Sequence, residues 1–364
     1  MRITLDATPL LGPKTGVGRY VHHLLAELPD AISRRGLDAQ VRATTWTARG
    51  SALTQLPAGV TQVGPRIPAR LLRQLWRRTD FPPIEALVGP TDVFHGTNFI
   101  SPPTRHAREV VTIHDLTYVK HAHTVTSASL LYRELVPRAL ARGARVVTPS
   151  ETVAAAVREF YALPPRQVVA TPLGVEEPWF NASPPSATWL AKRNVPPEYL
   201  VFVGSLDPRK NLPALLAAYG LLRARSTAAP ALVLAGPAGR EESLAAQPGV
   251  HVTGWLDDDD LRDLVAGSRA LVLPSLDEGF GLPVLEALAC GRPVVVSDIP
   301  ALLEVAGPHA ITAAPTDPDA LADALERALA GPDDERARTA RRERARLFTW
   351  AAFAERTLDV YLEP

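Results

Sequence analysis

The stretch of sequence that decides the fold is ALVLPSLDEGFGLPVLEALA, residues 270–289. It opens with four apolar residues, Ala270–Leu273, as expected of a strand buried on both faces of a parallel sheet. Gly279 and Gly281 then allow the backbone to approach a ligand closely, and Pro283 suits the first turn of a helix. The stretch therefore predicts a strand, a loop and a helix whose free N-terminal amides favour a phosphate group.

Two acidic residues frame this loop. Glu278 lies in the loop, where a carboxylate can contact a sugar, and Glu286 lies about one turn into the helix, where a carboxylate can bind a ribose diol. The alternative is a capped helix that carries two acids by chance. Two acids at this spacing are common, but two acids that frame Gly-Phe-Gly-Leu-Pro after a buried strand are not. We therefore interpret both as binding residues.

Short β-branched runs alternate with helical segments along the whole chain, which is typical of parallel βαβ units. The predicted strands are Ile3–Asp6, Val41–Thr45, Val93–Phe94, Val110–Ile113, Arg145–Thr148, Tyr199–Val203, Ala231–Ala235, His251–Thr253, Ala270–Leu273 and Pro293–Val296. The predicted helices include Tyr20–Leu28, Leu130–Ala141, Thr152–Phe160, Leu212–Arg223 and Leu261–Ala266. Two such sets in tandem predict two doubly wound α/β domains.

The domain boundary is expected in the Pro-rich stretch 172–197, because the composition shifts there and 364 residues suffice for two domains. This gives a first domain of residues 1–175 and a second of residues 176–348. The amphipathic C-terminal segment, residues 349–364, is expected to pack back onto the first domain. The Arg-rich run Arg336–Arg346 carries interspersed acids and predicts a solvated helix face.

Charge and cysteine content exclude several classes of protein. Lys plus Arg and Asp plus Glu both number 39, so the basic excess of a dedicated nucleic-acid binder is absent, although residues 1–180 carry 21 basic against 14 acidic side chains. The single cysteine, Cys290, cannot form an internal disulfide and predicts a reducing compartment. No run approaches the roughly 20 apolar residues of a membrane span, and no signal region opens the chain. We expect a soluble cytoplasmic protein.

Two charged clusters invite a chemical interpretation. Arg209 and Lys210 follow a predicted strand and a proline, where adjacent cations can neutralise a diphosphate leaving group. A solvated pair before a helix is the alternative. The run Asp257–Asp260 has carboxylates that suit a hard cation, but capping of the following helix explains it better, so we predict no metal site.

The pair Glu278 and Glu286, with seven residues between the acids, resembles the two-glutamate motif of retaining glycosyltransferases of family 4 (GT4), and the resemblance covers essentially the whole chain. The other segments that resemble the family's motifs are Thr15–Tyr20, its N-terminal glycine loop; His95–Asn98 and Thr112–Leu116, its strand-end motifs; Val203–Asn211, its phosphate-binding loop; Gly254–Leu256, the loop lining the nucleobase; and Gly291–Val295, the strand after the glutamate helix. The resemblance implies the GT-B fold, two Rossmann-like doubly wound domains facing across a cleft.

The resemblance also implies site residues. The catalytic residues would be Glu278, His114, Arg209 and Lys210, with His114 in contact with the transferred sugar. The nucleotide donor would be bound by Gly16, Gly18, Gly204, Ser205, Leu256, Gly279, Phe280, Gly281, Leu282 and Glu286. Ser205 departs from the family pattern, because many members carry an arginine there. No essential metal and no cofactor besides the nucleotide-sugar donor are implied.

The activity that this resemblance implies is transfer of a hexosyl group, with retention, from a nucleotide sugar to a glycan or lipid-linked acceptor. The glycine loop and strand-end motifs look most like those of mannosyltransferases, so GDP-mannose is the first donor expected. A UDP- or dTDP-sugar donor, a GT-B epimerase or phosphorylase, and a non-catalytic partner protein remain alternatives. A nicotinamide-dependent oxidoreductase is disfavoured, because no third glycine follows Gly16 and Gly18 at the required spacing.

Residues 66–78 form a separate basic segment. Its five arginines interleave with leucines and one tryptophan; they are Arg66, Arg70, Arg73, Arg77 and Arg78. The pattern is typical of an interfacial helix attracted to anionic lipid, which would place the protein peripherally at the inner face of the membrane. An ordinary surface helix that packs its leucines into the protein core explains the same pattern equally well.

Overall fold

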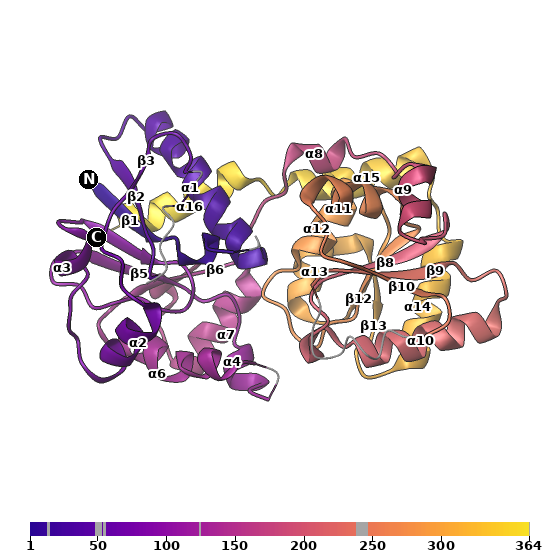
Figure 1. The fold of residues 1–364 in the computed structure, drawn as a ribbon, viewed down its shortest axis with the longest axis horizontal. Coiled ribbons are helices and arrows are strands. Elements are labelled where there is room, and N and C mark those ends of the chain that lie inside the picture. Colours follow the sequence, from indigo (N-terminus) through magenta and orange to yellow (C-terminus); the bar gives the residue numbers. More distant parts are fainter. Residues whose placement is uncertain (13–14, 48–52, 54–55, 124, 238–246, 364) are drawn as a thin grey trace. The chain divides into compact units, whose positions relative to one another are not determined.

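The computed structural model describes residues 1–364 except 13–14, 48–52, 54–55, 124, 238–246 and 364 (Figure 1). The chain divides into two compact units. Unit 1 comprises Met1–Gly174 and Thr349–Pro364, and unit 2 comprises Val175–Phe348. Among the described residues, no helix is long and apolar enough to cross a membrane.

Unit 1 contains a seven-stranded parallel sheet with the order β3-β2-β1-β4-β5-β6-β7. Its strands are β1 Arg2–Asp6, β2 Gln40–Thr44, β3 Val60–Gln62, β4 Val93–Gly96, β5 Arg108–Thr112, β6 Arg145–Thr148 and β7 Val168–Ala170. Five of them confirm predicted strands. Strands β3 and β7 were not predicted, because both are three-residue edge strands with a single buried residue each and so no long apolar run.

The helices of unit 1 lie on both faces of this sheet, with α1 and α16 on one and α2, α6 and α7 on the other (Figure 1). Their bounds are α1 Gly16–Arg34, α2 Ala69–Arg78, α3 Glu85–Val88, α4 Thr117–Lys120, α5 Ser127–Leu130, α6 Tyr132–Ala141, α7 Glu151–Tyr161 and α16 Trp350–Leu362, with 3-10 turns η1 Thr8–Leu10 and η2 Pro165–Gln167. The interpretation of Gly16 and Gly18 as loop residues is corrected, since both lie in the first turn of α1.

The C-terminal helix α16 packs on α1 and completes the core of unit 1. Its Tyr361 is fully buried, and the hydroxyl lies 2.5 Å from Nδ1 of His95. Glu355 of α16 forms an ion pair with Arg35, just beyond the end of α1. At the start of the helix the chain passes so close to Gly174 that a Cβ there would lie 2.2 Å from the backbone nitrogen of Trp350. The first turn of α16 is therefore fixed against the point where the chain leaves unit 1.

Helix α2 divides its residues between the core and the surface. Leu72 and Trp76 are buried, as an ordinary surface helix requires, while Leu71 and Leu75 on the outer face are 53% and 39% exposed. Of the five arginines predicted to face lipid, Arg66, Arg70 and Arg78 are exposed. The other two are turned to the protein: Arg77 pairs with Glu134, and Arg73 lines a pocket.

Unit 2 contains a six-stranded parallel sheet with the order β10-β9-β8-β11-β12-β13. Its strands are β8 Tyr199–Val203, β9 Ala231–Ala235, β10 Val250–Gly254, β11 Ala270–Leu273, β12 Val294–Ser297 and β13 Ala310–Ala313. All five predicted strands are confirmed. The edge strand β13 was not predicted; only its last residue, Ala313, is buried.

Helices cover both faces of this second sheet, with α11, α12 and α15 on one and α10 and α14 on the other (Figure 1). The bounds are α8 Glu177–Phe180, α9 Ala187–Lys192, α10 Leu212–Arg225, α11 Asp258–Gly267, α12 Leu282–Ala289, α13 Pro300–Ala306, α14 Pro318–Ala330 and α15 Glu335–Arg346, with 3-10 turns η3 Pro208–Lys210 and η5 Gly307–His309. The Pro-rich stretch 172–197 holds α8 and α9, most of it within unit 2.

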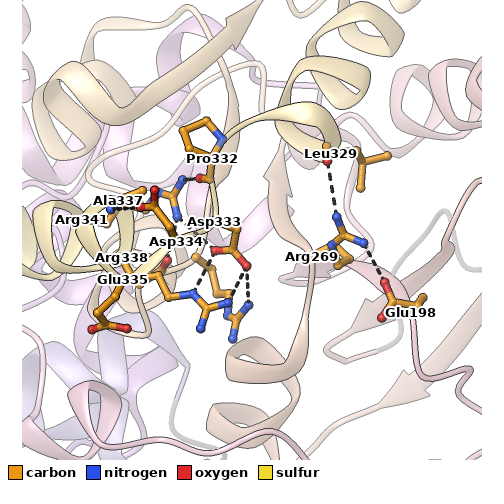
Figure 2. A network of polar contacts seen from close by, with 12 residues as sticks. Glu198, Arg269, Leu329, Pro332, Asp333, Asp334, Glu335, Ala337, Arg338 and Arg341 are labelled. Carbon is orange, nitrogen blue, oxygen red and sulfur yellow. Dashed lines mark hydrogen bonds and ion pairs between the residues drawn. The ribbon is translucent and has the colours of Figure 1, made fainter.

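The Arg-rich segment has the predicted solvated face, with Arg336, Glu343 and Arg346 exposed, but its opposite face packs inward. Arg341 of α15 is buried and donates hydrogen bonds to the carbonyl oxygens of Gly291, at 3.0 Å, and Pro332, at 2.8 Å. Figure 2 shows Asp333 accepting hydrogen bonds from Arg338 and Arg341. Arginine covers apolar surface with its stem while its guanidinium satisfies carbonyls at turns, so a charge-rich helix can still pack inward.

Candidate active site

Ligands of parallel α/β sheets bind at the carboxyl ends of the strands, where the strand order reverses. In unit 2 this reversal lies between β8 and its neighbour β11, since the chain adds β9 and β10 on one side and β12 and β13 on the other. The two loops that leave these strands carry the residues singled out by sequence. They run from Gly204 to Lys210 and from Pro274 to Gly281.

The structure brings together three of the four residues predicted to be catalytic. The Glu278 side chain is only 7% exposed, and its Oε1 accepts hydrogen bonds from Lys210 Nζ, at 2.5 Å, and Ser275 Oγ, at 2.7 Å. The second carboxylate oxygen, Oε2, accepts from a terminal nitrogen of Arg209 at 3.0 Å. We call Glu278, Arg209 and Lys210 the charge triad.

The charge triad keeps Glu278 ionised. Burial alone would raise its pKa, but the positive charges of Lys210 and Arg209, with hydrogen bonds from Lys210 and Ser275, outweigh burial and lower the pKa to about 2. At neutral pH one carboxylate thus faces two cations, so the cluster carries one surplus positive charge. Such a cluster attracts a polyanion such as a diphosphate.

Arg209 and Lys210 are held by the backbone as well as by Glu278. Arg209 donates to the carbonyl oxygen of Asp277 at 2.8 Å, and its own carbonyl accepts from the amide of Leu276 at 2.9 Å, which ties the two loops together. The stem of Lys210 passes over Gly204, where a Cβ would lie 3.3 Å from Lys210 Cε. Gly204 also adopts a φ of 155°, so the glycine suits both the turn and the lysine above it.

The loop before α12 presents its backbone rather than its side chains. Gly281 caps the helix in the left-handed region with a φ of 96°, and a Cβ there would lie 2.6 Å from Leu302. Phe280 and Leu282 on either side of it are buried. Because these side chains are buried, Phe280 and Leu282 can contact the donor only through their main-chain groups. The same holds for Gly279, which has no side chain.

Glu286 and Leu256 are also largely enclosed. Glu286 is the fifth residue of α12, about one turn into the helix as predicted from sequence, and is 2% exposed, so a ribose would reach only the edge of its carboxylate. Burial, together with the negative charge of Glu286, raises the pKa of the nearby Cys290 thiol to about 12.

Leu256 is buried, and its neighbour Trp255 is the exposed side chain of that loop. Ser205, half-buried, lies beside Gly204 at the end of β8.

Two residues that shape this site were not predicted as site residues. Ser275 donates a hydrogen bond to Glu278, and Asn211 links three loops. Asn211 adopts the left-handed conformation with a φ of 58°, and its Nδ2 donates to the carbonyl oxygens of Pro274, at 3.0 Å, and Pro315, at 2.6 Å. An asparagine directly before a predicted helix is a signal for such a conformation, since asparagine tolerates it better than most residues do.

His114, the fourth residue predicted to be catalytic, lies in unit 1 just after β5. Its Nε2 lies 2.9 Å from the carbonyl oxygen of Thr97, which fixes that nitrogen as the donor and leaves Nδ1 as an acceptor in the neutral ring. Burial lowers the pKa of His114, so the ring is neutral at pH 7. The ring also packs edge-on against Tyr20, with centroids 5.0 Å apart. A neutral acceptor nitrogen suits contact with a sugar hydroxyl.

The acidic run Asp257–Asp260 has the structural role predicted from sequence. The Asp257 side chain caps α11 by accepting from the amide of Asp260 at 2.8 Å, and Asp260 in turn accepts from Arg193 at 2.6 Å. Across the described ranges, no group of three or more His, Cys, Asp or Glu side chains is placed to hold a metal ion.

Comparison with known proteins agrees with this arrangement. Residues 14–177 match the model of "Glycosyltransferase Family 4" and residues 197–331 that of "Glycosyl transferases group 1". The chain is 28% identical to the O-antigen chain mannosyltransferase B of Escherichia coli over 99% of both chains. It is 34% identical to the MMP alpha-(1->4)-mannosyltransferase of Mycolicibacterium hassiacum over 59% of this chain and 53% of that one.

Solved structures extend the likeness to the fold. Sucrose-phosphate synthase from Thermosynechococcus elongatus superposes with a TM-score of 0.75 at 22% sequence identity, covering 99% of this chain and 98% of that one. One family model matches most of unit 1 and the other matches most of unit 2. Each unit contains a Rossmann-like parallel sheet. The chain is therefore a glycosyltransferase of family GT4 with the GT-B fold.

Proposed function

We propose that this glycosyltransferase transfers a mannosyl group from GDP-mannose to a glycan or lipid-linked acceptor, with retention at the anomeric carbon. The observation that carries the chemistry is the charge triad at the carboxyl edge of the second sheet, which has one surplus positive charge. The mannosyl donor is supported by the two mannosyltransferases that resemble the chain. A UDP- or dTDP-sugar donor remains the alternative that the first experiment below would reveal.

In this proposal Arg209 and Lys210 stabilise the leaving diphosphate. As the bond between the anomeric carbon and the phosphate oxygen breaks, negative charge develops on that oxygen, and preorganised cations next to it lower the barrier. Glu278 holds both cations in place and offers its carboxylate to the sugar hydroxyls. His114 Nδ1, the acceptor of a neutral ring, would bind a further hydroxyl of the transferred sugar.

Retention then follows from attack on the face that the diphosphate leaves. The acceptor hydroxyl forms the new bond to the anomeric carbon, and its proton passes to the departing phosphate oxygen. Glu278 is a poor candidate for that base, since a carboxylate with a pKa of about 2, paired with two cations, has little affinity for a proton. The cations also take the place that a divalent metal would have, so activity is expected to survive a chelator.

Donor and stereochemistry can be tested on the purified protein. A thermal-shift panel of GDP, UDP, ADP and dTDP should show the largest stabilisation with GDP, because a ligand that binds only the folded state raises its stability. The anomeric configuration of the product, read by NMR, should match that of the donor. Stabilisation by another nucleotide would change the donor, and an inverted product would overturn the mechanism.

A lipid-linked acceptor is favoured by the outer face of α2. Leu71 and Leu75 of α2 are 53% and 39% exposed, and Phe81, three residues after the helix, is 63% exposed. Arg70 of α2 and Arg66, just before the helix, are exposed as well. Apolar side chains among arginines suit an anionic bilayer surface, where each basic residue contributes about 1 kcal/mol.

Vesicle co-sedimentation tests this contact. Arg70→Glu should weaken binding to anionic vesicles about tenfold or more, and high salt should release the wild type. Arg166→Glu, which changes another exposed arginine of unit 1, is the matched control and should bind as the wild type does. Equal binding to neutral and anionic vesicles would remove the membrane from the proposal.

A further inference from the structure

A series of buried hydrogen bonds connects the C-terminal helix to the end of β5. Nδ1 of His95 in β4 lies 2.5 Å from the hydroxyl of Tyr361 in α16, and Nε2 of the same ring lies 2.7 Å from the hydroxyl of Thr112 in β5. The Thr112 hydroxyl also lies 2.7 Å from the hydroxyl of Tyr20 in α1. All four side chains are buried. We call Tyr361, His95, Thr112 and Tyr20 the core network.

The protonation state of His95 suits this network. Burial, together with the neighbouring His114, lowers the pKa of His95 to about 3, so its ring is neutral at pH 7. A neutral imidazole has one donor and one acceptor nitrogen, and a hydroxyl both donates and accepts. Each link can therefore hold one proton, with all the protons pointing the same way along the network. Connected polar groups of this kind rigidify a core and specify one arrangement of it.

Thr112 carries the order of the core network to His114, two positions later in the sequence. Its hydroxyl holds Tyr20, whose ring packs edge-on against the His114 ring with centroids 5.0 Å apart. Its carbonyl oxygen accepts from the amide of Phe99 at 2.9 Å, and the Phe99 ring packs against His114 at 5.4 Å. The two oxygens of Thr112 thus fix both of the aromatic rings that contact His114, while the carbonyl of Thr97 fixes its Nε2.

We propose that His95 and Tyr361 are positioning residues for His114. They act through Thr112, which places the rings of Tyr20 and Phe99 against the imidazole. The contact of His114 with the transferred sugar rests on the function proposed above, whereas its dependence on α16 rests on the contacts of unit 1 alone. The C-terminal helix then contributes to turnover through the placement of a sugar-binding nitrogen, besides completing the core.

The test removes one hydroxyl at a time and keeps the shape of the side chain. Tyr361→Phe acts at the end of the core network that is farthest from His114 along the hydrogen bonds, and Thr112→Val acts in its middle. Turnover is measured as release of GDP from GDP-mannose in water, where the water oxygen bonds to the anomeric carbon, the phosphate oxygen departs, and mannose and GDP result. Each variant should lower kcat about tenfold or more and leave KM within about twofold, because a displaced group costs most in the transition state.

Three controls separate positioning from a purely structural role. Thr112→Ser keeps the hydroxyl and should restore kcat. Tyr161→Phe removes another hydroxyl of unit 1, which is hydrogen-bonded to Tyr118 at 2.7 Å, and should keep the wild-type kcat. In a His114→Ala background, Tyr361→Phe should lower kcat no further, since effects that pass through one group are not additive. Thermal melting of every variant checks the fold, and Thr112→Val carries the test should Tyr361→Phe fail to fold.

The NMR signals of the His114 ring report its placement directly. Their loss in His114→Ala assigns them, and they should move in Tyr361→Phe and Thr112→Val but not in Tyr161→Phe. Wild-type kcat in both network variants, or an equal loss of kcat with and without His114, overturns the proposal. A wild type that releases no GDP from GDP-mannose would refute the proposed donor; the His114 signals then decide, for the positioning role if they move and against it if they stay.

Discussion

Replacing Glu278 by glutamine removes the negative charge of the triad while keeping the shape of the side chain. The folded-state pKa of Glu278 falls from its ordinary 4.5 to about 2. At about 1.4 kcal/mol per pKa unit, ionised Glu278 contributes about 3 kcal/mol to the stability of unit 2 at neutral pH. Because the carboxylate is nearly inaccessible to water, screening by solvent reduces this little. Glu278→Gln should lower the free energy of unfolding by about that amount.

The pH dependence gives the sharper test. A group whose pKa is depressed on folding contributes stability above its unfolded pKa, and that contribution is lost as the pH falls through the folded pKa. The difference between wild type and Glu278→Gln should therefore be full at pH 7 and shrink between about pH 4.5 and pH 2. Urea denaturation across this range measures it, with exposed Glu343→Gln of unit 2 as the control. A difference below about 1 kcal/mol, constant from pH 7 to pH 3, would refute the charge triad as described.

Four further substitutions probe the same unit. Arg209→Ala and Lys210→Ala should each lower turnover about 10²–10³-fold, and the double variant should lose less than the product, since both act on one diphosphate; multiplicative losses would separate their roles. Glu286→Ala should weaken GDP binding by roughly 1.5–3 kcal/mol if it holds the ribose, and unchanged affinity by calorimetry would exclude that role. Asp333→Asn should cost about 1–3 kcal/mol in urea denaturation, because buried Arg341 loses its anionic partner; a cost near zero would show that the carbonyl contacts suffice.

The sequence predicted the central strands because each is a run of buried apolar residues, as Tyr199–Val203 and Ala270–Leu273 show. It failed at three of the four sheet edges, β3, β7 and β13, where burial is partial and the pattern is short, and succeeded at the edge strand β10. It identified Glu278, Arg209 and Lys210 separately, yet the ion pairs among them join residues 68 and 69 positions apart and depend on how two loops meet. No local pattern carries that information.

The pocket of unit 1 that Arg73 lines could not be predicted from the sequence for the same reason. Its residues Asp6, Trp46, Arg73 and Asn98 come from four separate segments, and each alone has an ordinary structural explanation. Arg73 was assigned to a lipid-facing surface because helical spacing groups it with the other arginines. The fold instead turns that side chain inward, since Leu72 and Trp76 on either side of it take the core positions.

The chain leaves unit 1 at Gly174 and returns to it only at Thr349, which sets the order of events during synthesis. At about 5–20 residues per second, a ribosome needs on the order of ten seconds or more to make unit 2 before α16 emerges. Throughout that interval the nascent unit 1 lacks Tyr361 and the helix that covers Tyr20 and His95. Unit 2, though encoded second, is the first to have all its residues, and a chain that stops before Tyr361 would leave unit 1 without the hydrogen-bond partner of His95.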